Sequence, residues 1–132
     1  MLEFLLIASP IAIILSAIIR GIVIARCSDD GPADTGTARY TVCAESGYAD
    51  SDNRYEFTLR RHGSGYRCYI DRTPSYRGRS TDAGVIHRLS DNRGYYICYT
   101  ANLPYLEQAK TLCRNWSNMT QRYIETGKTF EE

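Results

Sequence analysis

The sequence predicts an α+β protein in which an N-terminal transmembrane helix precedes a small domain of about four antiparallel strands, paired as two hairpins and covered by one C-terminal helix. Three observations support this prediction. Residues 4–19 are apolar or small and carry no charge. From residue 54 onward, apolar and polar residues alternate with a period of two, which is typical of strands. From residue 104 onward, apolar residues recur every three or four positions, which is typical of an amphipathic helix.

We expect four segments along the chain: a transmembrane anchor (1–26), a polar acidic linker (27–53), the α+β domain (54–128) and a tail (129–132). The linker has six acidic residues and one basic residue, a net charge of −5, whereas the domain has thirteen basic and six acidic residues, a net charge of +7. The linker is rich in Asp, Gly, Ser and Thr, which predicts a flexible tether. Residues 39–44 are the exception, because their strand-forming side chains suit an extra edge strand.

The apolar N-terminal segment is long enough to cross a lipid bilayer. A span of about 20 residues covers the hydrocarbon core, and residues 2–25 supply it if Arg20 extends its side chain to the headgroups. The alternative is a secretory signal peptide, which requires a positive N-terminal region and a small-residue cleavage site. Here Glu3 is the first charged side chain, and the segment ends at Arg26. We therefore expect an uncleaved anchor.

The charges beside the anchor predict its orientation. Arg20 and Arg26 lie at its C-terminal end, and an excess of Arg and Lys marks the cytoplasmic side. This rule predicts that the N-terminus lies outside and the C-terminal domain in the cytoplasm. The chain has five cysteines, an odd number without a Cys-x-x-Cys pair. In the cytosol we expect all five to be reduced.

Residues 54–71 predict the first hairpin. Gly63-Ser64 suits a two-residue turn in which Gly adopts a positive φ. The register that this turn imposes places two apolar pairs on the face toward the core, Leu59–Cys68 and Phe57–Ile70. It places two polar pairs on the outer face, Arg60–Arg67 and Thr58–Tyr69.

Residues 85–100 predict the second hairpin, with Asn92-Arg93-Gly94 as a three-residue loop. In that register Leu89 faces Ile97 and His87 faces Tyr99. The inner face then contains Val85, His87, Leu89, Tyr95, Ile97 and Tyr99. The outer face contains Ile86, Arg88, Tyr96 and Cys98. The opposite assignment of faces is the alternative.

The last element is a helix that Pro104 opens, with Asn102 as its cap and Gly127 just after its end. One stripe of this helix is apolar or small: Leu106, Ala109, Cys113, Trp116, Thr120 and Tyr123. Such a stripe packs against a core, so we expect Trp116 to be buried between helix and sheet.

The sequence contains no recognisable catalytic constellation. Its two histidines, His62 and His87, have no acid or cysteine at a motif spacing, and there is no phosphate-binding loop, dinucleotide motif, zinc-ligand spacing or nucleophile elbow. We therefore expect no enzyme activity, no cofactor and no metal.

The more informative feature is a surface rich in Arg and Tyr. Arg60 opposite Arg67 is a like-charge pair, which destabilises a sheet unless it is offset. The candidate surface for a partner or polyanion comprises Arg60, Arg67, Tyr69, Arg72, Arg77, Arg79, Arg88 and Tyr96. Arg with aromatic rings suits phosphate contact and base stacking, and a basic domain also suits anionic lipid. Because the basic excess is modest and spread out, we favour a protein-interaction or structural module with an unknown protein partner.

Overall fold

The computed structural model describes residues 36–131. The anchor expected over residues 1–26 and the first part of the expected linker, residues 27–35, lie outside the described residues. Within the described part, no helix combines the length and the apolar character needed to span a membrane.

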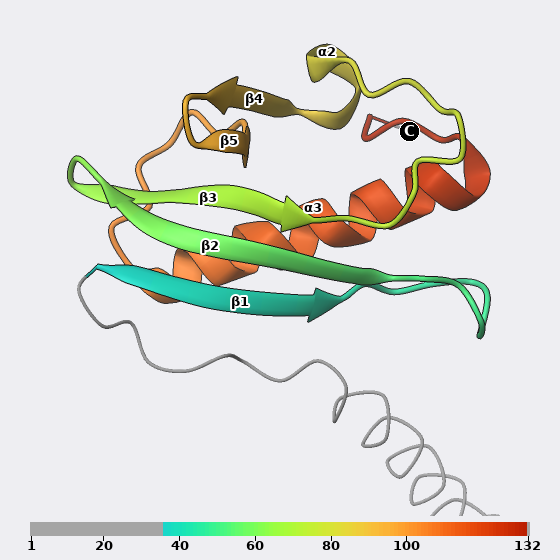
Figure 1. The fold of residues 1–132 in the computed structure, drawn as a ribbon, viewed down its shortest axis with the longest axis horizontal. Helices are drawn as coiled ribbons and strands as arrows, with labels where there is room; N and C mark the ends of the chain where they lie inside the picture. The colour runs from blue at the N-terminus through green and yellow to red at the C-terminus, as the bar shows by residue number, and fades with distance from the viewer. Residues whose placement is uncertain (1–35, 132) are drawn as a thin grey trace, which may run out of the picture.

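The described residues form an α+β fold with one five-stranded antiparallel sheet and a long C-terminal helix (Figure 1). The strand order is β1-β2-β3-β5-β4. The strands are β1 (Thr37–Cys43), β2 (Arg54–His62), β3 (Gly65–Arg72), β4 (Arg88–Asp91) and β5 (Gly94–Ile97). The sheet has one strand more than the four predicted. The additional strand is β1, the edge strand that residues 39–44 suggested, and it pairs along its whole length with β2.

The first hairpin has the register that the sequence predicts. Leu59 lies opposite Cys68 and Phe57 opposite Ile70, while Arg60 lies opposite Arg67 and Thr58 opposite Tyr69. Gly63 opens the turn with a φ of 61°. The alternation and the turn chemistry indicate the same register here, which explains why it could be predicted.

The second hairpin differs from the prediction by one residue. Asp91 pairs with Gly94, so the turn contains only Asn92 and Arg93, and Leu89 lies opposite Tyr96 instead of Ile97. A one-residue shift moves a side chain to the other face of a sheet. Leu89 is therefore on the outer face and 44% exposed, whereas Arg88 lies on the inner side opposite Ile97. Tyr95 and Tyr99, expected on the inner face, are also about half exposed.

The segment before β4 is a helical turn and not a strand. Helix α2 (Ala83–Ile86) ends at His87, which adopts a left-handed φ of 52°. The backbone N–H groups of Val85 and Ile86 both donate to the Asp82 carbonyl. This turn buries Ile86 completely, so its expected outward position is wrong.

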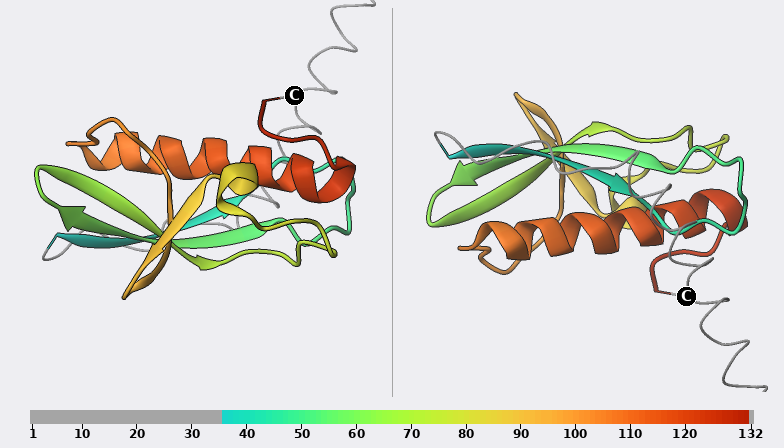
Figure 2. Two further views of the ribbon diagram at one scale, coloured as in Figure 1. Left: turned by 90° about the horizontal axis from the view of Figure 1, so that it is seen from above. Right: turned by 90° about the horizontal axis from the view of Figure 1, so that it is seen from below.

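Helix α3 (Leu106–Thr126) packs on one face of the sheet (Figure 2). Trp116 is 1% exposed and meets the rings of Tyr55 and Phe57 edge-on, at centroid distances of 6.0 and 6.1 Å. Its indole N–H donates to the Ile86 carbonyl at 2.8 Å. The expected burial of Trp116 is thus confirmed, and its hydrogen bond ties α2 to α3.

The ends of α3 confirm one expected cap and correct the other. Gly127 ends the helix with a φ of 79°, and its N–H donates to the Tyr123 carbonyl. The N-cap residue is Tyr105, whose backbone N–H donates to the side chain of Gln108. Asn102 lies too far upstream to cap, and its side-chain amide donates instead to the Ser64 hydroxyl in the β2–β3 turn.

The described cysteines fall into two classes. Cys43, the last residue of β1, is disulfide-bonded. Cys68, Cys98 and Cys113 are free thiols, and Cys68 and Cys113 are buried between β3 and α3. The expectation that every cysteine is reduced is therefore wrong for Cys43.

Candidate interaction face on the sheet

A continuous row of side chains crosses all five strands on the face opposite α3, which we call the outer face. Strand register places one residue of each strand in this row: Arg39, Thr58, Tyr69, Tyr96 and Leu89. Alternate residues of a strand point to the same side. Since α3 lies against the inner face (Figure 2), none of the described helices covers this row, although Tyr69 at its centre is only 7% exposed.

Four residues at the centre of the outer face form an Arg–Tyr cluster: Arg67, Tyr69, Asp91 and Tyr96. One oxygen of Asp91 accepts the Tyr69 hydroxyl at 2.6 Å and the Arg67 guanidinium at 3.0 Å. The same guanidinium lies over the Tyr96 ring, 4.1 Å from its centroid. The rings of Tyr69 and Tyr96 meet near edge-on at 5.9 Å. The Asp91 carboxylate, the Tyr69 hydroxyl and the Arg67 guanidinium therefore each have a partner within the cluster.

The hydrogen bonds of the cluster define its charge state. The Tyr69 hydroxyl, followed by the Arg93 backbone N–H and Arg67, lowers the pKa of Asp91 below its ordinary value. Burial raises the pKa of Tyr69, and the bond to Asp91 raises it further. At neutral pH Asp91 is therefore ionised, Tyr69 is neutral, and the positive charge of Arg67 is offset.

His62 extends the cluster toward the β2–β3 turn. Its Nε2 lies 2.9 Å from the Arg67 guanidinium. A guanidinium can only donate hydrogen bonds, so Nε2 of His62 is the acceptor in this contact. Three neighbours of Arg67 therefore offset its repulsion from Arg60: the Asp91 carboxylate, the His62 imidazole and the Tyr96 ring.

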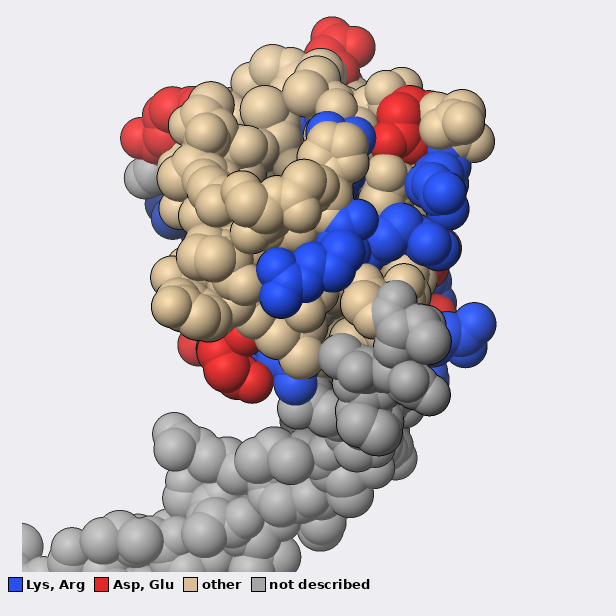
Figure 3. Space-filling model, turned by 90° about the vertical axis from the view of Figure 1, so that its left-hand side faces the viewer, with Lys and Arg blue, Asp and Glu red and all other residues tan. Residues whose placement is uncertain are grey.

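Basic side chains gather at the end of the molecule that carries the β2–β3 turn (Figure 3). There Arg60 and Arg61 directly precede His62, the last residue of β2, and Arg67 follows early in β3. Arg61 lies over the Tyr66 ring at 4.4 Å and donates to the Pro104 carbonyl. Arg60 forms no ion pair with another described residue.

The structure brings together four of the eight side chains that the sequence nominated as a surface: Arg60, Arg67, Tyr69 and Tyr96. Arg72 lies at the far end of β3, ion-paired with Asp52 at 2.7 Å. Arg77 donates to the Ser51 hydroxyl, and Arg79 donates to the Ile124 carbonyl near the end of α3. Arg88 lies on the inner side over the rings of Tyr95 and Tyr76, at 3.7 and 5.7 Å.

Sequence reasoning missed two residues of the outer face, Asp91 and Arg39. The sequence does not indicate Asp91, because its place beside Tyr69 depends on the two-residue turn in which Asp91 pairs with Gly94. Arg39 begins the extra edge strand suggested for residues 39–44, but the sequence did not indicate that it joins the outer face, where β1 places it opposite Thr58. A signal for Arg39 existed, because it alternates with Ala38 and Tyr40, which are buried.

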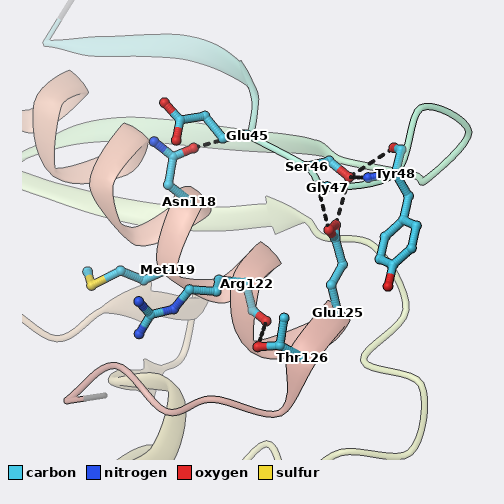
Figure 4. A pocket seen from close by; sticks show the side chains of 9 residues that line it. All are labelled: Glu45, Ser46, Gly47, Tyr48, Asn118, Met119, Arg122, Glu125 and Thr126. Carbon is cyan, nitrogen blue, oxygen red and sulfur yellow. Dashed lines mark hydrogen bonds between the residues drawn. The ribbon is translucent and has the colours of Figure 1, made fainter.

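A hollow of about 580 Å³ lies where the β1–β2 connection meets the last turns of α3 (Figure 4). Glu125 fastens the connection there, accepting the Ser46 hydroxyl at 2.7 Å and the Gly47 N–H at 2.9 Å. Burial opposes ionisation of Glu125, but bonds from Gln121, Ser46 and Gly47 outweigh it and lower its pKa. Asn118 accepts the Glu45 N–H. The polar groups that line the hollow therefore satisfy one another. Their hydrogen bonds hold the β1–β2 connection against α3.

Neither region assembles a nucleophile with a general base. Across residues 36–131, no three His, Cys, Asp or Glu side chains come together as a site for a metal ion. The chain matches no known protein family, no curated protein and no solved structure.

Proposed function

We propose that the chain is a single-pass membrane protein whose domain is a protein-interaction module, anchored by residues 2–25 and contacting its partner through the outer face. The observation that carries this proposal is the row of Arg, Thr, Tyr and Leu side chains that no described helix covers. Arg and Tyr are enriched among the residues that dominate protein interfaces. The Arg–Tyr cluster fixes its side chains in advance, which lowers the entropic cost of binding.

Polyanion binding is the second candidate, supported by the basic end of the molecule near Arg60. The ion pairs argue for a protein partner instead. Arg67, Arg72 and Arg54 each contact a carboxylate, at 3.0, 2.7 and 2.7 Å. A guanidinium already satisfied by a carboxylate gains less from a phosphate, because the first bond must be broken. The same argument weakens a role in binding anionic lipid.

A photocrosslinking experiment tests the proposal on the full-length chain in native membranes. A photoreactive residue at Leu89, exposed on the outer face, should form a defined protein adduct. The matched control at Glu107, exposed on α3, should not. Tyr96→Ala should remove the Leu89 adduct. Adducts of equal yield from both positions, or none from Leu89, would contradict the proposal.

A salt titration separates the two candidates. The purified protein should show no salt-sensitive binding to single-stranded DNA or to vesicles containing phosphatidylserine. Phosphate contacts release counterions, so a polyanion module would lose affinity steeply between about 50 and 200 mM salt. Binding of that kind, abolished by Arg60→Ala, would favour the second candidate.

A further inference from the structure

Two arginine side chains on the outer face have no partner among residues 36–131. Arg39 on β1 and Arg60 on β2 form no ion pair, side-chain hydrogen bond or ring contact with a described residue. Every other described arginine except Arg93 has at least one such contact. Arg39 is exposed and Arg60 is half-buried, so both guanidinium groups can donate to a bound partner.

Strand register places these two arginines beside each other. Arg39 lies opposite Thr58, and Arg60 follows Thr58 by two residues on the same strand. Arg39 and Arg60 are therefore diagonal neighbours on the outer face, with about 7–8 Å between their Cα atoms. Arg60 also lies opposite Arg67, which Asp91 offsets. No described carboxylate contacts Arg39 or Arg60, so the repulsion between these two like charges is not offset within the described residues.

We propose that Arg39 and Arg60 receive two carboxylates from an extended acidic segment of the partner protein. This inference rests on the proposed function, because it specifies what the outer face contacts. Alternate residues of an extended chain point to the same side and lie about 6.6–6.8 Å apart. This spacing matches the diagonal separation of the two arginines. Acidic residues at positions i and i+2 of the partner can therefore each meet one guanidinium.

Two other arginines of the sheet show how the domain holds a carboxylate. Arg67 donates to Asp91 at 3.0 Å, and the Tyr69 hydroxyl donates to the same oxygen. Arg72 holds Asp52 at two points, with nitrogen–oxygen distances of 2.7 and 3.3 Å. The planar guanidinium favours such two-point contacts, which add specificity to the ion pair. Arg39 and Arg60 offer the same donors, and a partner can supply the carboxylates.

The acids around the pair favour a protein segment over a nucleic acid. Carboxylates share the outer face with the two arginines: Asp91 in the Arg–Tyr cluster, Glu56 opposite Thr41, and Asp71, which accepts the Thr58 hydroxyl at 2.6 Å. A nucleic-acid strand carries a charge on every nucleotide, so a strand crossing this face would bring further phosphates close to these carboxylates. A protein segment can place its acids at the two arginines and neutral side chains elsewhere.

Fluorescence anisotropy of the purified full-length protein in detergent tests the inference with a labelled eight-residue peptide of alternating Glu and Thr. The peptide should bind, and its affinity should fall as salt screens the exposed charges. Arg39→Gln and Arg60→Gln should each weaken binding about two- to fivefold, and together about tenfold. Neither substitution breaks a contact with a described side chain, so the fold should be retained. Arg93→Gln, in the β4–β5 turn, is the matched control and should bind like wild type.

Three outcomes of this measurement would overturn the inference. The first is that the peptide does not bind the wild-type protein. The second is that Arg93→Gln weakens binding as much as Arg60→Gln, because the peptide would then respond only to net charge. The third is that a thymidine oligonucleotide of equal charge binds more tightly than the peptide and loses its binding in the double variant, which would assign the two arginines to a nucleic acid.

Photocrosslinking in native membranes separates this inference from the proposed function. The Leu89 adduct reports contact with the outer face, whereas Arg39→Glu together with Arg60→Glu reverses the charge of the pair. The double reversal should remove the adduct, and Arg93→Glu should not. An adduct that survives the double reversal would overturn the acidic segment and leave the interaction face in place. Absence of the adduct in the wild-type protein would contradict the proposed function alone, because peptide binding measures the two arginines independently.

Discussion

The Tyr69 hydroxyl on β3 donates a 2.6 Å hydrogen bond to Asp91 on β4, although β5 lies between these two strands in the sheet. The same Asp91 oxygen accepts Arg67, and the Arg67 guanidinium lies over Tyr96 of the intervening strand. Tyr69 opposite Tyr96 is the register pair that joins β3 to β5. The Arg–Tyr cluster therefore reinforces the junction between the large hairpin and the short one.

Asp91→Asn should make the domain less stable at neutral pH and remove part of its sensitivity to acid. The amide keeps the size of the side chain but loses the charge that Arg67 offsets. The pKa of Asp91 is lowered in the folded protein. Its contribution to stability is therefore fully present above its unfolded pKa of about 3.9 and is lost as the pH falls through the folded value.

Urea denaturation of the full-length protein in detergent, followed by Trp116 fluorescence, measures this effect. The midpoint difference between wild type and Asp91→Asn should be largest near pH 7 and should shrink below about pH 4. Asp50→Asn, in an exposed loop, is the matched control and should follow wild type. A midpoint difference that is constant from pH 7 to pH 3 would show that the carboxylate charge is not what stabilises the junction.

Arg67→Ala and Arg60→Ala should have opposite effects, although the two residues face each other. Arg67→Ala removes the ion pair to Asp91 and uncovers the Tyr96 ring, so it should lower the denaturation midpoint. Arg60→Ala removes one member of a like-charge pair and breaks no ion pair with a described residue, so the midpoint should stay unchanged or rise slightly. An equal decrease of the denaturation midpoint in both variants would contradict this prediction. It would mean that each arginine stabilises the domain through its positive charge alone and not through the contacts of the Arg–Tyr cluster.

The sequence alone supports the first hairpin because two independent patterns coincide there. The alternation of Tyr55, Phe57 and Leu59 indicates which face is buried, and Gly63-Ser64 fixes the turn length. Where both agree, one register is favoured. The stripe of α3 was predictable for a similar reason, since twenty-one residues carry the helical period clearly.

The second hairpin could not be predicted in the same way. Its strands have only four residues each, too few for alternation to decide between a two-residue and a three-residue turn around Arg93. Val85, Ile86 and Leu89 also satisfy a helical spacing, and Ile86 is buried through the helical turn of α2. The candidate site depended on this register. Asp91 could join Tyr69 only once the turn length and the strand order were known.

Trp116→Ala should remove a large part of the stability of the domain and lower its melting temperature. Truncating a buried aromatic side chain costs about 3–5 kcal/mol, and small domains have a total stability of about 5–15 kcal/mol. Here the edge-on contacts with Tyr55 and Phe57 and the bond to the Ile86 carbonyl are lost together. Circular dichroism melting measures the effect. Trp116→Phe, which retains the ring contacts but not the N–H, should lie between wild type and alanine; a Phe variant as unstable as the Ala variant would contradict this ranking.

Gln121→Leu should destabilise the domain through unsatisfied partners, although it replaces a buried amide with an apolar group. The Gln121 oxygen accepts the Tyr55 hydroxyl at 2.8 Å, and its nitrogen donates to the Asp52 carbonyl at 3.1 Å. An unpaired buried polar group costs about 1–3 kcal/mol. Adding Tyr55→Phe removes the orphaned hydroxyl, so the double variant should be less destabilised than the sum of the two single variants. Additive losses in this cycle would show that Tyr55 and Gln121 do not act as a pair.

A fragment that begins at residue 54 should fail to fold, whereas one that begins at residue 36 should fold. β1 supplies Ala38, Tyr40 and Val42 to the core, each less than one-tenth exposed. Burial of one large apolar side chain contributes about 1.5–3 kcal/mol. Removing the strand therefore eliminates a large part of a total stability of about 5–15 kcal/mol. It also leaves the edge of β2 unpaired, and an exposed edge strand promotes aggregation.

Fragments 36–131 and 54–131 can be compared by gel filtration and by the fluorescence of Trp116, the single tryptophan of the chain. The longer fragment should elute as one compact species with a cooperative urea transition. The shorter one should elute in the void volume or show no transition. Adding residues 36–53 as a synthetic peptide should restore the transition if β1 acts by pairing with β2. A cooperative transition in the shorter fragment alone would mean that the four remaining strands and α3 suffice for the fold.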